Sequence, residues 1–585
     1  MSAEKLITDH IDIWTSAVQA RLASGRGSGK KRELYGIKKL RELILELAVR
    51  GQLVPQDPSD EPASVLLERN FMEQARLVQT DKLKTKANRS FSVEDDYLTV
   101  PASWDRIRLG NLAKFIDYRG KTPKKIDSGV RLITAKNVKF GHISLLPEEF
   151  ISEEEYVSWM TRGFPRVGDI LFTPEAPLGN VAQVDLKEKF ALAQRAICFQ
   201  LHIPEISDFL KLFLMAPSFQ NLLLEKATGT TAKGIKASVL KELLVYLPSL
   251  CEQHRIVAKV DELMALCDQL ELQTEASLDA HQVLVETLLT TLTNSQDATK
   301  LMANWARISE HFDTLFTTGE SIDQLKQTIL QLAVMGKLVP QDPNDEPAAK
   351  LLERIAEEKA LLVKEKKIKK EKPQPFISED GRLFELPNGW VWSNIGETFL
   401  VTGGLQKTPK RTPVLNHYPY LAVANVQRGR LELDDLKRFE VTSEELERYR
   451  LMPGDLMVVE GNGSENEIGR CAIWSGEVQD CLHQNHLIKC RPLSLDLSSW
   501  VLQTLNSPFG IAVMKSLAVT SSGLYNLSVG KIRSIAFPLP PLKEQHRIVA
   551  KVDGLMALCD QLKSRLQTSQ QTQLALAEAL VEQAL

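Results

Sequence analysis

The sequence lacks any run of about 18 apolar residues, so we expect no segment that spans a membrane. Its first residues, MSAEKLITDHIDIW, show no basic end followed by an apolar stretch, and no secretion signal is expected. Cysteine is scarce: seven residues in a chain of 585, with no CxxC pair, argue against a disulfide scaffold and for a reduced, cytoplasmic protein. The net charge of −3 does not by itself indicate nucleic-acid binding, so any such indication must come from local clusters.

Sequence patterns of catalysis are missing as well. The stretch GNGSENEIG has neither the glycine spacing of a dinucleotide fingerprint nor the Gly-Lys-Ser/Thr ending of a P-loop. No paired-acid pattern of a metal nuclease and no Asn-Pro-Pro-Tyr-like motif of base methylation is found. In CLHQNHLIKC, Cys481, His483, His486 and Cys490 have a spacing that suits zinc, but the related stretch ALAQRAICFQ keeps only Cys198. We therefore predict neither a catalytic residue nor a metal site.

Two long strings each occur twice. LPSLCEQHRIVAKVDELMALCDQL at Leu247–Leu270 returns 292 positions later as LPPLKEQHRIVAKVDGLMALCDQL, with 21 of 24 residues identical. LAVRGQLVPQDPSDEPASVLLER at Leu47–Arg69 returns 285 positions later as LAVMGKLVPQDPNDEPAAKLLER, with 18 of 23 identical. The chain is therefore a tandem duplication, and two copies are too few for a solenoid.

Two divergent stretches, 101–247 and 386–539, lie between the repeated strings. Their similarity is faint but ordered: KTPKK matches KTPKR, and VGDILFT matches PGDLMVV. The matching residues are, in pairs, Lys121 and Lys407, Asn137 and Asn425, and Gln194 and Gln484. This pattern predicts one fold that carries two different surfaces.

The string that begins at Leu247 predicts a long helix over 252–293, because no proline or glycine interrupts it. Its apolar residues alternate in steps of four and three, which is the heptad seam of a helix that packs against a partner. The seam consists of Ile256, Val260, Leu263, Cys267 and Leu270, and its second copy of Ile548, Val552, Leu555, Cys559 and Leu562. We predict that the two seams pair with each other in an antiparallel, rigid spacer about 60 Å long. The alternative, in which each seam packs on its own globular domain, stays open.

These features predict an α+β fold. Two similar mixed α/β domains in a pseudo-twofold arrangement are separated by the antiparallel long-helix spacer. The expected segments are an N-terminal repeated helical region (1–70), a linker (71–100), the first divergent domain (101–247), a central repeated helical region (248–355), a charged linker (356–385), the second divergent domain (386–539) and a C-terminal spacer helix (540–585).

Each divergent domain starts with a cluster of cations. Tyr118–Phe140 contains seven lysines or arginines and one acid, and Leu405–Arg430 contains five and no acid. A charge cluster alone is usually a solvated surface, but matching clusters at matching places favour DNA, because Lys and Arg bind phosphates and, with Asn and Gln, base edges. The candidate DNA contacts are Arg119, Lys121, Lys124, Lys136, Asn137, Gln194 and Arg195 in the first domain, and Lys407, Lys410, Arg411, Asn425, Arg428, Arg430 and Gln484 in the second. Of these, we expect Arg428 or Arg430 to contact guanine and the Asn and Gln side chains to contact adenine.

The string LPPLKEQHRIVAKVD, which closes a divergent domain in both copies with little change, resembles the specificity subunit of type I restriction–modification enzymes, and LAVRGQLVPQDP resembles the type IB branch. The resemblance covers essentially the whole chain. It implies that each divergent stretch is a target-recognition domain and that the two domains bind the halves of a split double-stranded DNA site in inverted orientation. It further implies that the repeated helices dock two methylation subunits, which two restriction subunits join. S-adenosylmethionine, ATP and magnesium would then belong to those partners.

Two rival hypotheses stay open at this point. One is a self-contained nuclease or methyltransferase, which would form product from DNA, S-adenosylmethionine and magnesium without other subunits. The other is an assembly scaffold whose divergent domains bind protein. The recognised bases do not follow from the sequence, and the gap between half-sites follows only as about one helical turn of 10 base pairs for domains on the same face of the groove.

Overall fold

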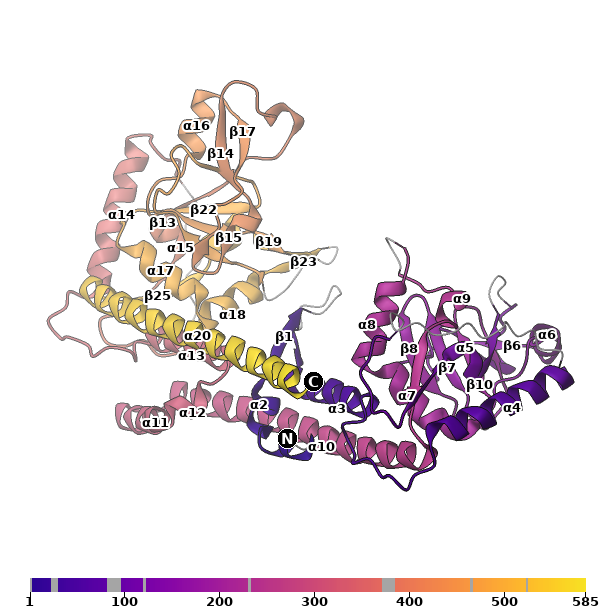
Figure 1. The fold of residues 1–585 in the computed structure, drawn as a ribbon. Coiled ribbons are helices and arrows are strands. Elements are labelled where there is room, and N and C mark those ends of the chain that lie inside the picture. Colours follow the sequence, from indigo (N-terminus) through magenta and orange to yellow (C-terminus); the bar gives the residue numbers. More distant parts are fainter. Residues whose placement is uncertain are drawn as a thin grey trace. The chain divides into compact units, whose positions relative to one another are not determined.

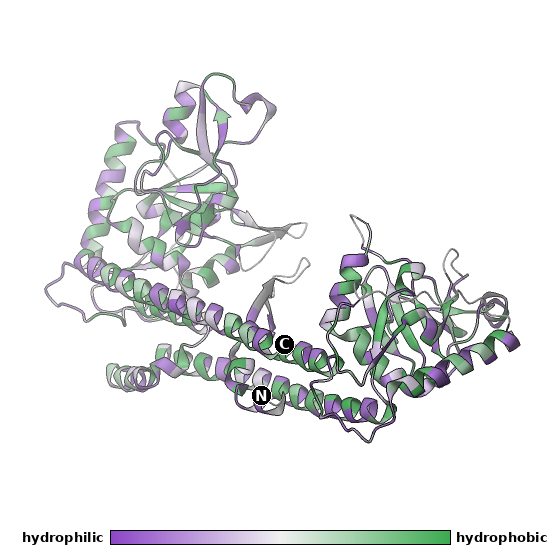
Figure 2. Ribbon diagram, viewed as in Figure 1, coloured by the Kyte–Doolittle hydropathy of each residue, from purple (hydrophilic) through white to green (hydrophobic). Residues whose placement is uncertain are grey.

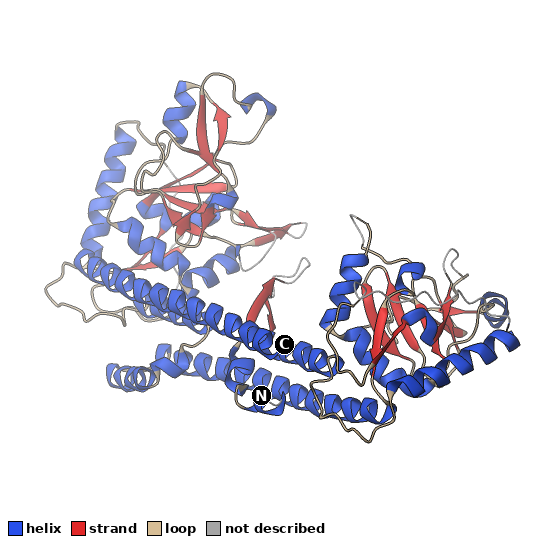
Figure 3. Cartoon of the chain, viewed as in Figure 1, coloured by secondary structure: helices blue, strands red, loops and turns tan. Residues whose placement is uncertain are grey.

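The computed structural model describes residues 3–22, 30–81, 96–118, 123–229, 233–370, 384–462, 467–521 and 524–585 (Figure 1). The chain forms two compact units of mixed helix and strand (Figure 3). Unit 1 comprises Met1–Leu278 and Thr568–Leu585, and unit 2 comprises Asp279–Gln567. Among the described residues, no helix is both long enough and apolar enough to cross a membrane.

The divergent stretch of unit 1, here called reader 1, is built on two sheets. The larger sheet has the order β4-β10-β7-β8 with antiparallel neighbours, and the smaller has the order β6-β5-β9 with β5 parallel to β9. A third pair, β3 with β11, joins the start of the reader to its end. The strands are β3 (Asp105–Arg108), β4 (Ala113–Asp117), β5 (Val130–Ile133), β6 (Phe150–Ile151), β7 (Ile170–Pro174), β8 (Leu178–Gln183), β9 (Phe190–Leu192), β10 (Ile197–Leu201) and β11 (Leu244–Leu247). The helices are α5 (Leu109–Leu112), α6 (Glu153–Trp159), η2 (Pro204–Ile206), α7 (Ser207–Met215), α8 (Pro217–Lys226) and α9 (Ala237–Leu240).

The divergent stretch of unit 2, reader 2, repeats this topology. Its four-stranded sheet has the order β13-β22-β18-β20, its three-stranded sheet has the order β17-β14-β21 with β14 parallel to β21, and β12 pairs with β25. The strands are β12 (Val391–Asn394), β13 (Phe399–Gly403), β14 (His417–Leu421), β15 (Val426–Gln427), β16 (Arg430–Leu431), β17 (Lys437–Glu440), β18 (Leu456–Val459), β19 (Gly461–Asn462), β20 (Cys471–Ile473), β21 (Leu482–His483), β22 (Leu487–Pro492), β23 (Val519–Ser521), β24 (Leu524–Asn526) and β25 (Ala536–Leu539). The helices are α15 (Ile395–Thr398), η4 (Pro409–Arg411), η5 (Val423–Asn425), α16 (Ser443–Tyr449), α17 (Leu497–Asn506), α18 (Pro508–Leu517) and α19 (Val529–Arg533). The prediction of two similar mixed α/β domains is confirmed.

The central strands of both readers are largely hydrophobic, while helices on their outer faces alternate between hydrophobic and hydrophilic residues (Figure 2). In reader 1 the buried rings of Phe172 and Phe199 stack with centroids 5.6 Å apart, and Phe209 and Phe213 of α7 belong to the same core. In reader 2, Trp500 of α17 is fully buried in the corresponding place between sheet and framework. Burial of such large apolar groups is the main favourable contribution to folding of each unit.

The repeated strings form a helical framework in each unit. α4 continues to Asp81, although a linker was expected from residue 71, because FMEQARLVQTD contains no proline or glycine to end it. Strands β1 and β2 interrupt the region expected to be helical. The framework elements are α1 (Ala3–Thr8), α2 (Ile11–Ser16), β1 (Gln19–Leu22), β2 (Lys30–Glu33), α3 (Tyr35–Val49), α4 (Ala63–Asp81), α10 (Leu250–Thr293), α11 (Ala298–Glu310), α12 (Phe312–Leu315), α13 (Gly319–Val334), α14 (Ala348–Lys364) and α20 (Leu542–Ala584).

The two long helices, α10 and α20, connect the units in opposite directions. α10 starts in unit 1 and ends in unit 2, where Val285, Leu289 and Leu292 are buried in the core. α20 starts in unit 2 and ends in unit 1, where Ala577 is buried in the core. Each long helix therefore contributes side chains to the cores of both units.

Each heptad seam has a partner helix within its own unit. The α10 seam from Ile256 to Leu270 is buried in unit 1 in one cluster with α3, and Arg41 of α3 forms ion pairs of 2.6 Å with both Asp268 and Glu271 of α10. The α20 seam lies in unit 2 in one cluster with α13, and Lys563 of α20 pairs with Asp323 of α13 at 2.6 Å. Each seam therefore packs within its own unit, which is the alternative that the sequence left open.

A buried carboxylate at the first turn of each long helix holds three segments together. In unit 1, Glu252 is 3% exposed and accepts hydrogen bonds from the indole N–H of Trp104, at 2.9 Å, and from the side-chain amide of Gln56. One turn later, the guanidinium of Arg255 donates to both carboxylate oxygens of Asp60, at 3.1 and 2.7 Å, and lowers the pKa of that carboxyl. The long helix, the VPQDP loop and the first turn of reader 1 therefore meet at one point.

Unit 2 contains the same junction. Glu544 is 1% exposed and accepts a hydrogen bond from the indole N–H of Trp390 at 3.0 Å, and burial raises the pKa of its carboxyl. Arg547 pairs with Asp345 at 2.6 Å. We call these two sites the carboxylate junctions. The two repeated strings are thus bonding partners of each other within each copy, which explains physically why they recur together.

We predict that Trp104→Phe and Trp390→Phe each lower the free energy of unfolding by about 1–3 kcal/mol, because a buried carboxylate oxygen loses a donor that water cannot replace. Urea denaturation monitored by circular dichroism measures the change. The matched control is Trp392→Phe, whose indole N–H makes no hydrogen bond to any described residue. Equal stability of Trp390→Phe and Trp392→Phe would contradict the prediction.

Candidate nucleic-acid interface

A buried asparagine shapes the loop that follows β5 in reader 1. Asn137 is 1% exposed. Its side-chain oxygen accepts from the backbone N–H and the hydroxyl of Thr134, at 3.0 and 2.8 Å, and its side-chain amide donates to the carbonyls of Ser144 and Pro147, at 2.9 and 3.1 Å. The segment 134–147 is therefore closed around this one side chain.

Reader 2 has the same arrangement around Asn425, which is 8% exposed. The Asn425 oxygen accepts from the N–H of Ala422 at 2.8 Å, and its amide donates to the carbonyl of Glu432 at 2.8 Å. Both hairpins turn at a glycine with positive φ, +95° at Gly141 and +75° at Gly429, a conformation that suits glycine. We call these loops the anchored hairpins.

Asn137 and Asn425 were predicted to contact bases, and the structure corrects this. Both side chains are buried, and their hydrogen-bonding groups are directed to the backbone of their own hairpins. A base edge could replace those bonds only by unfolding the hairpin. Their match in the sequence thus reflects a shared scaffold rather than a shared contact with DNA.

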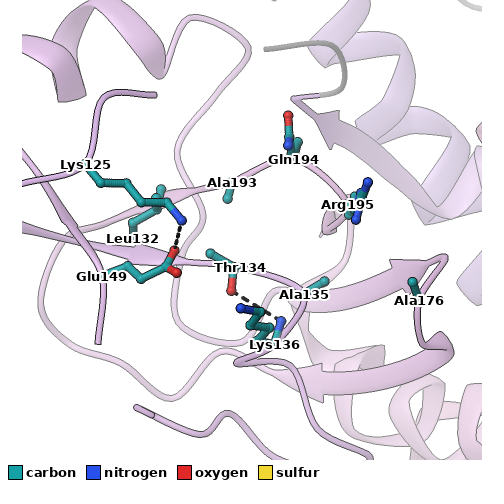
Figure 4. A pocket seen from close by; sticks show the side chains of 10 residues that line it. All are labelled: Lys125, Leu132, Thr134, Ala135, Lys136, Glu149, Ala176, Ala193, Gln194 and Arg195. Atoms are coloured by element: carbon teal, nitrogen blue, oxygen red, sulfur yellow. Dashed lines mark hydrogen bonds and ion pairs between the residues drawn. The ribbon is translucent and has the colours of Figure 1, made fainter. Parts of the chain in front are cut away.

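Three predicted contacts of reader 1 meet at a pocket of about 230 Å³ beside its anchored hairpin (Figure 4). They are Lys136, from the loop after β5, and Gln194 and Arg195, from the turn between β9 and β10. β5 and β9 are parallel neighbours, so the two segments that follow them emerge at the same edge of the sheet. The complete lining is Lys125, Leu132, Thr134, Ala135, Lys136, Glu149, Ala176, Ala193, Gln194 and Arg195.

The charges of the pocket are mostly cationic and accessible. The side chain of Arg195 is 58% exposed and lies 3.2 Å from the carboxylate of Glu175, while Lys125 pairs with Glu149 at 2.7 Å. Arg195 has φ of +68°, a strained value for a residue with a side chain, and such strain tends to occur at functional sites. Lys136 and Lys124 are exposed. This edge of reader 1 can bind an anion and donate hydrogen bonds to acceptors beside it.

The strand register gives the true counterpart of this turn in reader 2. The N–H of Ala193 donates to the carbonyl of Ile133 at 2.8 Å, and the N–H of Gln484 donates to the carbonyl of Leu421 at 3.0 Å. Ile133 and Leu421 each directly precede an anchored hairpin, so Gln484 corresponds to Ala193. The sequence match of Gln194 with Gln484 is therefore wrong by one residue.

The residues that correspond to Gln194 and Arg195 are Asn485 and His486. His486 is exposed and its imidazole lies 3.6 Å from Glu460, as Arg195 lies near Glu175. Burial raises the pKa of the Glu460 carboxyl. The acids at the ends of β7 and β18 were missed in the sequence, because neither belongs to a cation cluster and their nearness to the turn arises only from strand pairing.

Two predicted arginines of reader 2 are directed inward. Arg411 donates to both carboxylate oxygens of Glu445, at 3.2 and 2.8 Å, and its side chain is only 20% exposed. Arg428 donates to the carbonyl of Ile468 at 3.0 Å, and burial lowers the pKa of its guanidinium. Both were expected to contact DNA, and in this structure both bind the protein instead.

The accessible predicted cations of reader 2 are Arg430, Lys407 and Lys410. The side chain of Arg430, at the anchored hairpin, is 73% exposed and pairs with Glu432 at 3.0 Å, a surface contact that contributes little. Gln484 is half-buried. Arg119 and Lys121 lie outside the described residues.

The stretch that resembled a zinc site contributes to two core strands, β21 and β22. His483 is fully buried, its Nδ1 lies 3.2 Å from the carbonyl of Tyr449, and burial lowers its pKa to about 3. Cys481 and Cys490 are buried free thiols. In the ranges that the structure describes, no three or more His, Cys, Asp or Glu side chains are grouped to hold a metal ion.

Comparison with known proteins reveals clear relatives. Residues 101–280 match the family model "Type I restriction modification DNA specificity domain". The chain is 40% identical over 614 residues to the type I restriction enzyme EcoEI specificity subunit of Escherichia coli, and 41% identical over 603 residues to the EcoAI specificity subunit of the same species, with 100% of each chain covered in both cases. The solved structure of the HsdS subunit from Thermoanaerobacter tengcongensis is 18% identical, covers 83% of this chain and 97% of its own, and has a TM-score of 0.38.

The chain belongs to the family of type I restriction enzyme specificity subunits. Identity of this extent over complete chains decides the assignment. A specificity subunit recognises DNA and directs the modification and restriction subunits, and it is not itself catalytic. Family membership therefore argues against the two rival hypotheses, a self-contained enzyme and a scaffold that binds only protein.

We predict that Asn137→Ala lowers the free energy of unfolding by about 1–3 kcal/mol, because the backbone groups that Asn137 satisfies are left without partners in the protein interior. The control is Lys136→Ala, the adjacent exposed residue, for which no change beyond about 0.5 kcal/mol is expected. Thermal and urea unfolding measure both. If Asn137→Ala were as stable as the control and changed only DNA affinity, Asn137 would be a base contact after all.

Proposed function

We propose that each reader binds one half of a split DNA site through its anchored hairpin and the turn beside it. The observation that carries this proposal is that both readers build the same hairpin on a buried asparagine yet carry unlike side chains at the accessible positions. Reader 1 carries Lys136, Gln194 and Arg195 there, and reader 2 carries Arg430, Asn485 and His486. A shared scaffold with different side chains suits two unlike half-sites.

Within this proposal, the side chains have different roles. Lys124, Lys136, Lys407 and Lys410 are exposed ammonium groups suited to phosphates, and Arg119 and Lys121 remain candidates for the same role. Arg195 and Arg430 are the accessible arginines suited to the two acceptors of guanine, O6 and N7. The amides of Gln194, Gln484 and Asn485, all three half-buried, suit the donor and acceptor that adenine presents in the major groove.

The presence of two copies of the framework supports a proposal for the assembly. We propose that two modification subunits dock on the two copies and that two restriction subunits join them, with S-adenosylmethionine, ATP and magnesium bound by those partners. We further propose that the two half-sites lie about one helical turn of 10 base pairs apart. Assignment to the type IB branch and to the cytoplasm, where its DNA would be and where seven free cysteines stay reduced, belongs to the same proposal.

We predict that Arg430→Ala weakens binding of the assembled modification complex to its site by about 1–3 kcal/mol and relaxes the base preference at one position of one half-site. Methylated positions mapped across the genome measure preference, and gel shifts on the mapped site measure affinity. Arg430→Lys is the matched control, because it keeps the charge but cannot make the paired contact.

If Arg430 contacts a phosphate instead, Arg430→Lys retains affinity and Arg430→Ala weakens all sequences equally. A gel-shift series over salt tests the DNA-binding role itself. The logarithm of affinity should fall linearly with the logarithm of salt concentration, and Lys410→Ala should reduce that slope by about one. Binding that is independent of salt would contradict the proposed function.

A further inference from the structure

Among the side chains of reader 2 whose exposure the structure describes, the two most exposed large apolar ones lie next to each other on one loop. Val414 is 73% exposed and Leu415 is 84% exposed. A single exposed apolar side chain on a surface is ordinary, but two adjacent ones on a loop offer a contiguous apolar contact. The loop, Thr412–Asn416, joins η4 to β14.

This loop is held rigidly by one carboxylate. Glu440, at the end of β17, accepts hydrogen bonds from three successive backbone N–H groups, those of Val414 at 2.8 Å, Leu415 at 3.1 Å and Asn416 at 2.7 Å. These bonds lower the pKa of the Glu440 carboxyl, so it is ionised at neutral pH. Three amides fixed on one anion leave the loop little freedom, and the two apolar side chains are presented outward in a preformed geometry.

The surroundings of the loop favour DNA over protein as the occupant. Lys407 and Lys410 precede it, and Lys437 and Arg438 lie on the neighbouring strand β17, opposite Tyr420 and Pro419 of β14; all four are exposed. Of the described acids in this reader, Glu440 is bonded to the loop and Glu445 to Arg411, while Asp434 and Asp435, which precede Lys437, are exposed. Apolar side chains with exposed cations nearby suit a polyanion that also presents apolar groups. DNA is such a polyanion, because thymine presents its methyl group in the major groove.

The position of the loop agrees with a second contact on the same half-site. β14 runs from the loop to the anchored hairpin and has five residues. At about 3.4 Å per residue it separates the two features by about 17 Å, which is about five base-pair steps of B-DNA. The corresponding segment of reader 1, Ile126–Gly129, offers one apolar side chain, Ile126, at 38% exposure. The feature therefore distinguishes the two readers.

We propose that Val414 and Leu415 form an apolar contact of reader 2 with thymine methyl groups, and so determine A·T preference in the second half-site. This inference rests on the proposed function. Glu440 is a positioning residue, which holds the loop and does not touch the bases. The contact requires no movement of the loop before binding.

The test uses the full chain assembled with its modification subunits and a duplex that carries the mapped site. Each thymine of the second half-site is replaced in turn by deoxyuridine, which removes only the methyl group. We expect at least one replacement to weaken wild-type binding about fourfold, the effect of one buried methyl group. The variant V414S/L415S should bind the unmodified duplex more weakly and should be insensitive to that replacement.

The matched control is Leu495→Ser, because Leu495 is 70% exposed in the same reader but lies on a different loop, the one before α17. It should keep both the affinity and the deoxyuridine effect. The proposal is overturned if deoxyuridine has no effect, if V414S/L415S behaves as wild type, or if it loses only the modification subunits. It is also overturned if the second half-site contains no A·T pair. If the wild-type complex shows no sequence-specific binding to DNA, the proposed function as a whole is contradicted.

Discussion

In each of the two units, the packing of the reader on its framework depends on a buried carboxylate at the first turn of a long helix. Glu252 and Glu544 are stabilised in the interior by hydrogen bonds, among them one from an indole N–H of the reader, Trp104 or Trp390. In unit 1 the adjacent Arg255–Asp60 pair ties the same turn to the framework loop. Reader, loop and helix are thus coupled, so a change in one alters the geometry of all three.

A second hydrogen bond connects framework and reader in each unit. The side chain of Glu46 on α3 accepts from the N–H of Ser218 at the start of α8, at 3.0 Å, and Gln331 on α13 accepts from the N–H of Phe509 at the start of α18, at 3.0 Å. Each satisfies a backbone donor that a helix start leaves without an internal partner. The framework therefore holds its reader at two places, and the side chains of the two readers differ at the anchored hairpins and the adjoining turns.

Much of the fold was predictable because repetition and periodicity are local properties of the sequence. The duplicated strings, the long helix and the two mixed domains follow from them directly. The helices that the seams contact could not be predicted, because a heptad pattern indicates that a helix packs on a partner but does not identify the partner. In the structure the partners are α3 in unit 1 and α13 in unit 2. For the same reason Asn137 and Asn425 were mistaken for DNA contacts: their buried position arises from tertiary hydrogen bonds. The pairing of Arg195 with Glu175 depends on strand register, which a faint alignment misplaced by one residue.

The central claim is that one rigid frame, present twice, carries two unlike DNA readers. Mapping methylated bases genome-wide in cells with and without this chain tests it most directly. The account predicts that a single motif disappears with the chain, and that this motif has two unlike halves separated by a constant gap. A motif without a gap, or methylation that is unchanged when the chain is removed, would contradict it.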